Sequence, residues 1–324
     1  MEQREEELLR IFAASVRELL KRSALDYDKL QEVRLRVQAP LLIRYGNIEY
    51  YIGVDGRLRG EQKDAYIVQK ADIKETVEYI SQYSLYAYEE EIRQGFITIQ
   101  GGHRVGMAGK VIMEKEGIKS MKYISFINIR LSHQIKGCAD PLLPFVTDGT
   151  QVKHTLIISP PRCGKTTLLR DLIRQLSNGD NGHRGVTVGV VDERSEIGAC
   201  YMGTPQNDLG IRTDVLDCCP KAEGMMMLVR TMAPEVIAVD EIGGRRDLEA
   251  IEYVRNCGCK LIATVHGSSI DDIRTKPLLR KLVQEHVFER YVVLGDTSIA
   301  GKITEVFDAQ GNPLYRSCIS AACI

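Results

Sequence analysis

Hydrophobic positions in the second half of the chain follow two alternating patterns. Short apolar runs, typical of buried strands, are separated by segments in which apolar residues recur with helical spacing, as at Leu168, Leu169, Leu172 and Ile173. The runs predict strands at about residues 155–159, 186–192, 236–240, 261–265 and 291–295, and then a hairpin over 302–315. This alternation indicates a mostly parallel α/β sheet, which we expect to occupy residues 151–324.

The first half of the chain shows more strand-like alternation. Residues 1–22 predict a charged amphipathic helix, which packs on its own domain or docks a partner. The remaining predicted elements are a strand at 32–38, a hairpin at 41–52, helices from Asp72 and over 85–94, and strands at 96–100, 105–113 and 122–131. We therefore expect a smaller α+β domain over residues 1–136, with an amphipathic helix, hairpins and a three-strand sheet. A linker containing Gly137, Pro141 and Pro144 is expected over 137–150.

The apolar run that ends at Ser159 leads into a phosphate-binding pattern. Strand, tight loop and helix in this order direct backbone N–H groups and the helix dipole at an anion. Lys165 can reach the outer phosphates of a nucleotide, and the Thr166 hydroxyl suits Mg²⁺. Ser159 departs from the pattern, which has glycine there, and the alternative is an ordinary core helix beginning at Lys165. The residues predicted to bind the nucleotide are Pro161, Arg162, Cys163, Gly164, Lys165, Thr166 and Thr167.

Two adjacent acids end a later apolar strand. Asp240 and Glu241 point to opposite sides of that strand, so they can have different roles. We expect Asp240 to hold Mg²⁺, in the Walker B manner, and Glu241 to orient and deprotonate the attacking water. The alternative is that both acids only cap the turn before Gly243 and Gly244.

Two other predicted strands also end in polar residues. Residues 192–196 contain three acids and Arg194, where α/β sheets bind ligands, and Glu193 and Arg194 are candidate catalytic residues. The alternative is a solvated loop with a surface ion pair. His266 ends the next strand and can donate a hydrogen bond to a γ-phosphate.

Composition limits the partners. The chain of 324 residues has a net charge of −1, which gives no bulk electrostatic reason for a nucleic acid or an anionic membrane as main partner. No apolar run is long enough to span a bilayer, and the N-terminus is acidic where a signal peptide would be basic. The nine cysteines show no framework, so free thiols are favoured over zinc.

The ordered motifs resemble a known group of enzymes. A Walker A loop, an acidic box, Asp240–Glu241 and a His box look like the RecA-like ATPases of type II and type IV secretion and of pilus assembly. Residues 192–198, 205–217, 221–227 and 239–244, with 93–99 and 101–109, resemble the stage III sporulation protein AA family over nearly the whole chain. Two departures are Ser159, where that family usually has glycine, and Asp240, where secretion ATPases usually have glycine.

This resemblance implies a RecA-like P-loop ATPase core, preceded by the α+β domain, that uses ATP and Mg²⁺. It also implies a homo-oligomer, expected to be a hexamer, in the cytoplasm of the mother cell of an endospore former. The protein would be peripheral to the membrane through embedded channel proteins, and would energise a secretion-like channel around the forespore. Two other functions stay open, a nucleic-acid-acting RecA-like ATPase and a nucleotide-gated scaffold without useful turnover.

The sequence leaves two further hypotheses at the nucleotide site. Cys163 lies beside Lys165 in a loop of N–H donors, which predicts either a reactive thiol or an inert loop residue. Charge on the transferred phosphoryl group needs further cations, supplied by another subunit or left as surface charge. Arg230 is assigned with Arg194 to the catalytic group, and the full set of candidate arginines is Arg93, Arg104, Arg130, Arg194, Arg212 and Arg230.

Overall fold

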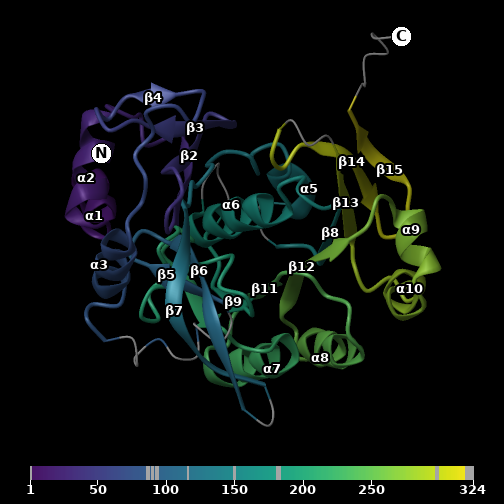
Figure 1. The fold of residues 1–324 in the computed structure, drawn as a ribbon. Coiled ribbons are helices and arrows are strands. Elements are labelled where there is room, and N and C mark those ends of the chain that lie inside the picture. Colours follow the sequence, from purple (N-terminus) through teal and green to yellow (C-terminus); the bar gives the residue numbers. More distant parts are fainter. Residues whose placement is uncertain are drawn as a thin grey trace. The chain divides into compact units, whose positions relative to one another are not determined.

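The computed structural model divides the chain into two compact units, Met1–His133 and Gln134–Ile324 (Figure 1). Each unit is described here by itself. The structure describes residues 2–84, 88, 91, 95–114, 117–148, 151–179, 184–295 and 299–317. In these ranges, no helix is long and apolar enough to cross a bilayer.

The first unit is built on an antiparallel sheet of seven strands in the order β4-β3-β2-β1-β7-β6-β5. The strands are β1 (Leu30–Arg36), β2 (Leu42–Tyr45), β3 (Ile48–Ile52), β4 (Leu58–Arg59), β5 (Phe96–Ile99), β6 (His103–Glu114) and β7 (Gly117–Arg130). The predicted strands are therefore parts of one sheet. The sequence missed β4, which has only two residues, and it predicted a start for β7 that is five residues too late.

The predicted N-terminal helix is two helices, α1 (Glu2–Arg10) and α2 (Ala14–Arg22). The helix is interrupted between them, where Phe12 is fully buried in the core. The Arg17 side chain donates hydrogen bonds to the carbonyl oxygens of Leu9 and Phe12 at this interruption. Apolar residues of α1, α2 and α3 (Lys70–Ile80) form one core with the sheet. Most of the helix predicted over 85–94, including Arg93, lies outside the described residues.

The second unit contains a sheet of eight strands in the order β10-β9-β11-β12-β8-β13-β14-β15. The strands are β8 (Thr155–Ser159), β9 (Val188–Asp192), β10 (Thr213–Asp217), β11 (Val236–Val239), β12 (Lys260–His266), β13 (Arg290–Leu294), β14 (Ile303–Asp308) and β15 (Pro313–Arg316). The first six are parallel and the last two antiparallel. The predicted mostly parallel sheet is confirmed, whereas β10 is an edge strand that the sequence missed.

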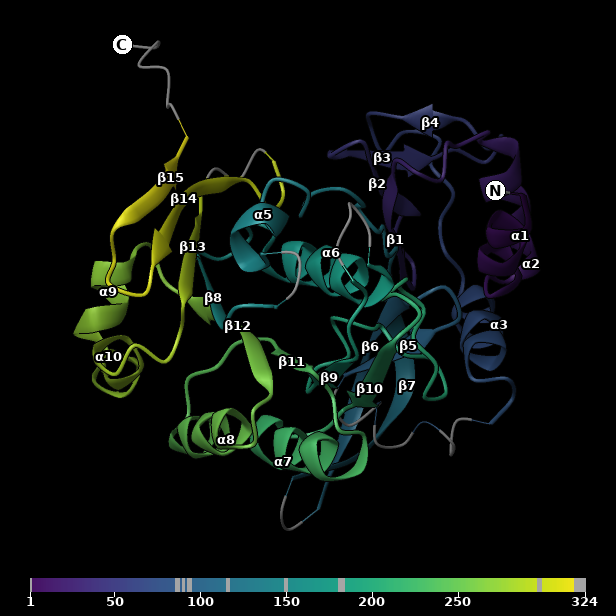
Figure 2. The ribbon, with the colours of Figure 1, turned by 180° about the vertical axis from the view of Figure 1, so that it is seen from behind.

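Helices cover both faces of this sheet, as Figure 2 shows from behind. Core residues of α5 (Leu143–Val146) and α6 (Lys165–Asn178) pack on one face. The other face packs against α7 (Lys221–Thr231), α8 (Arg245–Asn256), α9 (Ile270–Thr275) and α10 (Pro277–Gln284). The segment predicted as a linker contains α5, and its residues Ala139, Leu142, Leu143 and Val146 belong to the core of the second unit.

Candidate functional site

Parallel pairing brings the ends of four strands to one edge of the second sheet. Ser159 of β8 pairs with His266 of β12, and Val239 of β11 pairs with Val191 of β9. The residues that follow β8, β9 and β11 therefore meet near His266. Most of the motif residues predicted from separate parts of the sequence share this edge.

The phosphate loop joins β8 to α6 through a glycine that no other residue can replace without strain. Gly164 has a φ of 82°, and a Cβ there would overlap the backbone of Ala300 and Gly301. The Gly301 N–H also donates to the Cys163 carbonyl oxygen at 2.8 Å. Residues just before β14 thus cover the loop from outside.

Cys163 is part of the core and not of the loop surface. Its side chain is 2% exposed and belongs to the apolar cluster that packs on α6. The predicted reactive thiol is wrong for this arrangement, because an alkylating reagent cannot reach a buried sulfur. The inert alternative fits the structure.

The first turn of α6 contacts the two predicted acids directly. The Thr166 hydroxyl donates to Asp240 Oδ2 at 2.7 Å, and Lys165 Nζ lies 3.6 Å from Asp240 Oδ1. Lys165 Nζ also donates to Glu241 Oε1. The Thr264 hydroxyl donates to Asp240 and accepts the Glu241 N–H at 2.9 Å. Both acids are therefore fixed by their backbone and side-chain partners.

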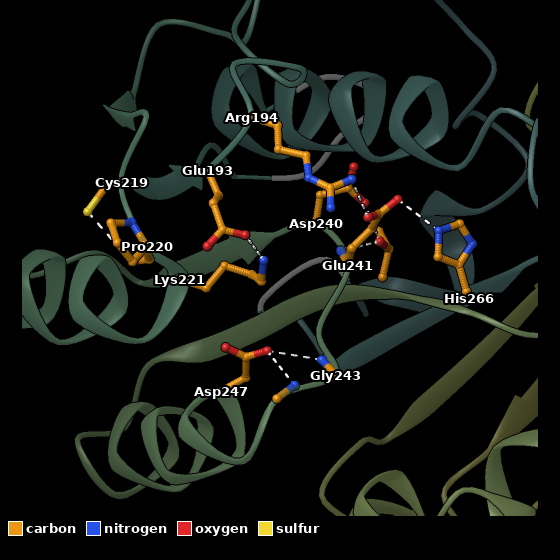
Figure 3. Close-up of polar contacts among 12 residues, drawn as sticks. Glu193, Arg194, Cys219, Pro220, Lys221, Asp240, Glu241, Gly243, Asp247 and His266 are labelled. Atoms are coloured by element: carbon orange, nitrogen blue, oxygen red, sulfur yellow. Dashed lines mark hydrogen bonds and ion pairs between the residues drawn. The ribbon is translucent and has the colours of Figure 1, made fainter. Parts of the chain in front are cut away.

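Glu241 is surrounded by basic groups, two of which Figure 3 shows. Arg194 Nη1 donates to its Oε2 at 3.0 Å, and His266 Nε2 lies 2.9 Å from its Oε1. Burial alone would raise the pKa of the Glu241 carboxyl, but the hydrogen bond and charge of Lys165 and the charges of His266 and Arg194 lower it overall. The carboxylate is held ionised and, with Lys165 attached, is a weak base.

A buried carboxylate organises the acidic loop after β9. Asp192 accepts the backbone N–H groups of Glu196, Ile197 and Gly198 at 2.8, 2.9 and 2.8 Å. Burial raises the pKa of Asp192 to about 6, although these hydrogen bonds act in the opposite direction. The turn that follows Arg194 is consequently rigid, and the alternative of a merely solvated loop does not describe it.

Arg170 of α6 ties this loop to the nucleotide-binding helix. Its Nε donates to the Ile197 carbonyl oxygen at 2.9 Å and its Nη2 to the Glu196 carbonyl oxygen at 2.7 Å. The sequence analysis missed Arg170. Its signal was a charged residue within an otherwise apolar helical stripe, five positions after Lys165.

We expect Arg170→Gln to loosen the loop that carries Arg194. Losing charge-assisted hydrogen bonds to two carbonyls should lower the free energy of unfolding by about 1.5–3 kcal/mol. Amide hydrogen exchange of residues 195–198 should accelerate. Arg255→Gln, at an exposed position of α8, is the control. Equal exchange rates in both variants would show that the hydrogen bonds of Arg170 do not stabilise the loop.

The remaining predicted catalytic residues lie in two different places. Glu193 pairs with Lys221 at the start of α7, beside a small hollow that Arg194 and Glu241 also line. Arg230 lies at the other end of α7, where its Nε donates to Tyr253 Oη at 3.4 Å. Eleven helical residues separate these ends by about 15 Å, so the structure does not bring Arg230 to Glu241.

The turn after Glu241 has its own cap. Asp247 Oδ2 accepts the N–H groups of Gly243 and Gly244 at 3.0 and 2.9 Å (Figure 3). The alternative in which Asp240 and Glu241 serve only to cap this turn is therefore wrong. Both carboxylates lie beside Lys165 of the phosphate loop, so the prediction that they point to opposite sides is wrong. Strand β11 ends at Val239 and Glu241 has a φ of 56°, so the alternation of a strand does not extend to these two acids.

The residues present fit a magnesium ion bound with a nucleotide. Mg²⁺ prefers hard oxygen ligands, and the Thr166 hydroxyl and the Asp240 carboxylate lie 2.7 Å apart beside the N-terminus of α6. In contrast, no three His, Cys, Asp or Glu side chains of the described ranges gather as a metal cluster.

Comparison with known proteins identifies the family. The sequence model described as "Sporulation stage III, protein AA" matches residues 2–314. The chain belongs to the stage III sporulation protein AA family. Stage III sporulation protein AA of Bacillus subtilis (strain 168) is 43% identical over 290 residues, covering 89% of this chain and 90% of that protein.

Two solved structures are similar to this chain in fold. The Legionella pneumophila ATPase DotB has a TM-score of 0.53 at 14% identity, covering 86% of this chain and 75% of that one. The pilus retraction motor PilT with bound ADP has a TM-score of 0.55 at 13% identity, covering 88% and 77%. The predicted fold class, a RecA-like core preceded by a smaller α+β domain, is confirmed.

Proposed function

We propose that this sporulation protein hydrolyses ATP with Mg²⁺ and energises a secretion-like channel complex in the membranes around the forespore. It acts as a ring, expected to have six subunits, in the mother-cell cytoplasm. Membrane-embedded channel proteins hold it at the membrane. The observation that carries the proposal is the contact of Lys165 and Thr166 with Asp240 and Glu241.

Glu241 and the phosphates of the nucleotide compete for the Lys165 ammonium group. An incoming triphosphate attracts the Lys165 ammonium away from Glu241, which raises the pKa of that carboxyl and makes it a better base. Glu241 then accepts a proton from the attacking water, while Arg194 and His266 keep it oriented. Backbone N–H groups of 163–167 hold the phosphates, and bound Mg²⁺ would neutralise their charge.

Phosphate release by the purified full chain tests this function. We expect turnover with ATP that stops when EDTA removes Mg²⁺. Stimulation by RNA or DNA would favour the nucleic-acid-acting alternative, and tight nucleotide binding without turnover would favour the scaffold. Capture of sporulating-cell membranes with and without ATP would then test the channel partner.

We further propose that an arginine from a neighbouring subunit completes the site. Arg212 donates to carbonyl oxygens at the end of α6 and Arg230 to Tyr253, so both have partners within their own chain. Arg130 is exposed and lies in register between Arg104 of β6 and Glu32 of β1, and we take it as the candidate to test.

Mixed subunits should reveal such an arginine. Glu241→Gln and Arg130→Ala chains, each inactive alone, should regain about a quarter of wild-type turnover when mixed equally, because some interfaces then carry both native groups. The specific activity of the wild type should also rise with protein concentration. Concentration-independent activity without rescue would mean that one subunit is a complete enzyme.

A further inference from the structure

The long β6–β7 hairpin extends beyond the sheet that it belongs to, as Figure 1 shows. Strand β5 pairs with β6 only as far as Gly106, and β1 pairs with β7 only from Phe126 onward. Residues 107–114 and 117–125 therefore continue as two strands, which we call the ribbon. Its base is joined to the rest of the unit, because the Met107 N–H donates to the Gly95 carbonyl oxygen at 3.3 Å and the Val37 N–H donates to the Ser125 carbonyl oxygen at 3.0 Å. Met107, Met121 and Ile124 also pack on the core. Beyond this base, neither edge of the ribbon pairs with another described strand.

The ribbon exposes large apolar side chains. Met113 is 67% exposed and lies opposite Ile118 in the register, near the described end of the ribbon, and Val111 and Tyr123 are also exposed. A β-bulge in β7 changes the register, because residues 123–125 lie opposite the single residue Gly109 of β6, where a Cβ would collide with the backbone of β7. Tyr123, within this bulge, has a φ of 50° and is 73% exposed.

Lysines accompany these apolar residues. Lys110 lies directly opposite Lys122, and two like charges in this position repel each other. Within the described ranges neither of them forms an ion pair, while Lys119 is 2.7 Å from Glu114. The described ribbon thus has three lysines and one glutamate, a local positive charge on a chain whose net charge is −1.

We propose that the ribbon binds directly to the surface of a membrane that contains anionic lipids. The apolar side chains of Met113 and Ile118, near the described end of the ribbon, can enter the boundary between headgroups and acyl chains. Lys110 and Lys122 lie nearer its base and on its other face, where they can reach lipid phosphates when the ribbon enters end first. Tyrosine is enriched at the same depth. An anionic surface also removes the repulsion between Lys110 and Lys122.

Other occupants match the ribbon less well. A nucleic acid would use the lysines but would leave Met113 and Ile118 in water. The buried centre of a protein interface is depleted in lysine, so it would not favour the Lys110–Lys122 pair. An anionic lipid surface uses both the charge and the apolar residues.

Sedimentation of the full chain with vesicles tests the proposal. Vesicles of phosphatidylcholine with about one third phosphatidylglycerol should bind the protein, and pure phosphatidylcholine should not. The Lys110→Glu/Lys122→Glu variant should bind roughly tenfold less or worse. Met113→Ser/Ile118→Ser should also bind less, and its remaining binding should disappear at high salt.

Matched controls separate the ribbon from general surface effects. Lys63→Glu/Lys70→Glu and Ile48→Ser/Val54→Ser change the same residue types at exposed positions of the same unit, and should bind as the wild type does. Equal binding to both vesicle types, or ribbon variants that bind like these controls, would overturn the proposal.

A spectroscopic measurement avoids dependence on destabilised variants. The chain has no tryptophan, so Tyr123→Trp introduces a single tryptophan on the ribbon, which can be excited separately from the tyrosines. Its emission should shift to shorter wavelength when anionic vesicles are added. Tyr83→Trp, at a side chain that is 74% exposed, should not shift, and an unshifted ribbon fluorophore would count against membrane contact.

Discussion

The Glu241→Gln enzyme should bind ATP as tightly as the wild type and hydrolyse it about 10²–10⁴-fold more slowly. The amide keeps the shape of the carboxyl group, but its NH2 group cannot accept a hydrogen bond as the replaced carboxylate oxygen does. It cannot accept a proton from water, and it loses the negative charge that attracts Lys165, Arg194 and His266. Nucleotide affinity and steady-state phosphate release measure the two effects separately.

A matched acid provides the control for this experiment. Glu223→Gln changes an exposed glutamate of α7 in the same unit and should leave turnover within about twofold of the wild type. Hydrolysis by Glu241→Gln at the wild-type rate would show that Glu241 is not the base. Weakened ATP binding would instead indicate that the amide disturbs the loop.

Lys165→Ala should abolish tight nucleotide binding. Removing one partner of a buried, hydrogen-bonded charge pair costs about 2–5 kcal/mol, which corresponds to a loss of affinity of roughly 30- to 5,000-fold. The Lys165 side chain is 8% exposed in the structure, where Asp240 and Glu241 are its partners. Calorimetric titration with ATP would measure the change.

The stability of this variant distinguishes binding from folding. Two acids lose a buried cation in Lys165→Ala, so the melting temperature should fall even without nucleotide. Lys153→Ala, outside the loop, should change neither property. Nucleotide affinity that survives in Lys165→Ala would remove Lys165 from the phosphate site and would count against the proposed function.

The sequence was a good guide where hydrophobic pattern and loop chemistry agree. The runs before Ser159, Asp192 and Asp240 are buried on both sides of a parallel sheet, so they stand out as continuous apolar segments. Because parallel strands bring their carboxyl ends together, Lys165 could be paired with Glu241 across 76 positions.

Elements set by tertiary packing could not be predicted in this way. Strand β10 has the sequence Thr-Asp-Val-Leu-Asp and is only partly buried, so its pattern is weak. The break between α1 and α2 depends on Phe12 entering the core, and no helix-ending residue stands there. Arg170 acts through backbone carbonyls, which no sequence motif encodes.

Backbone contact between the phosphate loop and residues 300–301 also has a consequence for engineering the chain. Gly164 and Gly301 both have positive φ, at 82° and 78°, and the space beside Gly164 is filled by the Gly301 backbone. A library that randomises these two positions together should therefore return glycine at both. A side chain at position 164 would overlap the backbone of residue 301, and both positions have a φ that favours glycine. Fusions and tags near β14 will be tolerated only if they keep the backbone contact between Gly164 and Gly301.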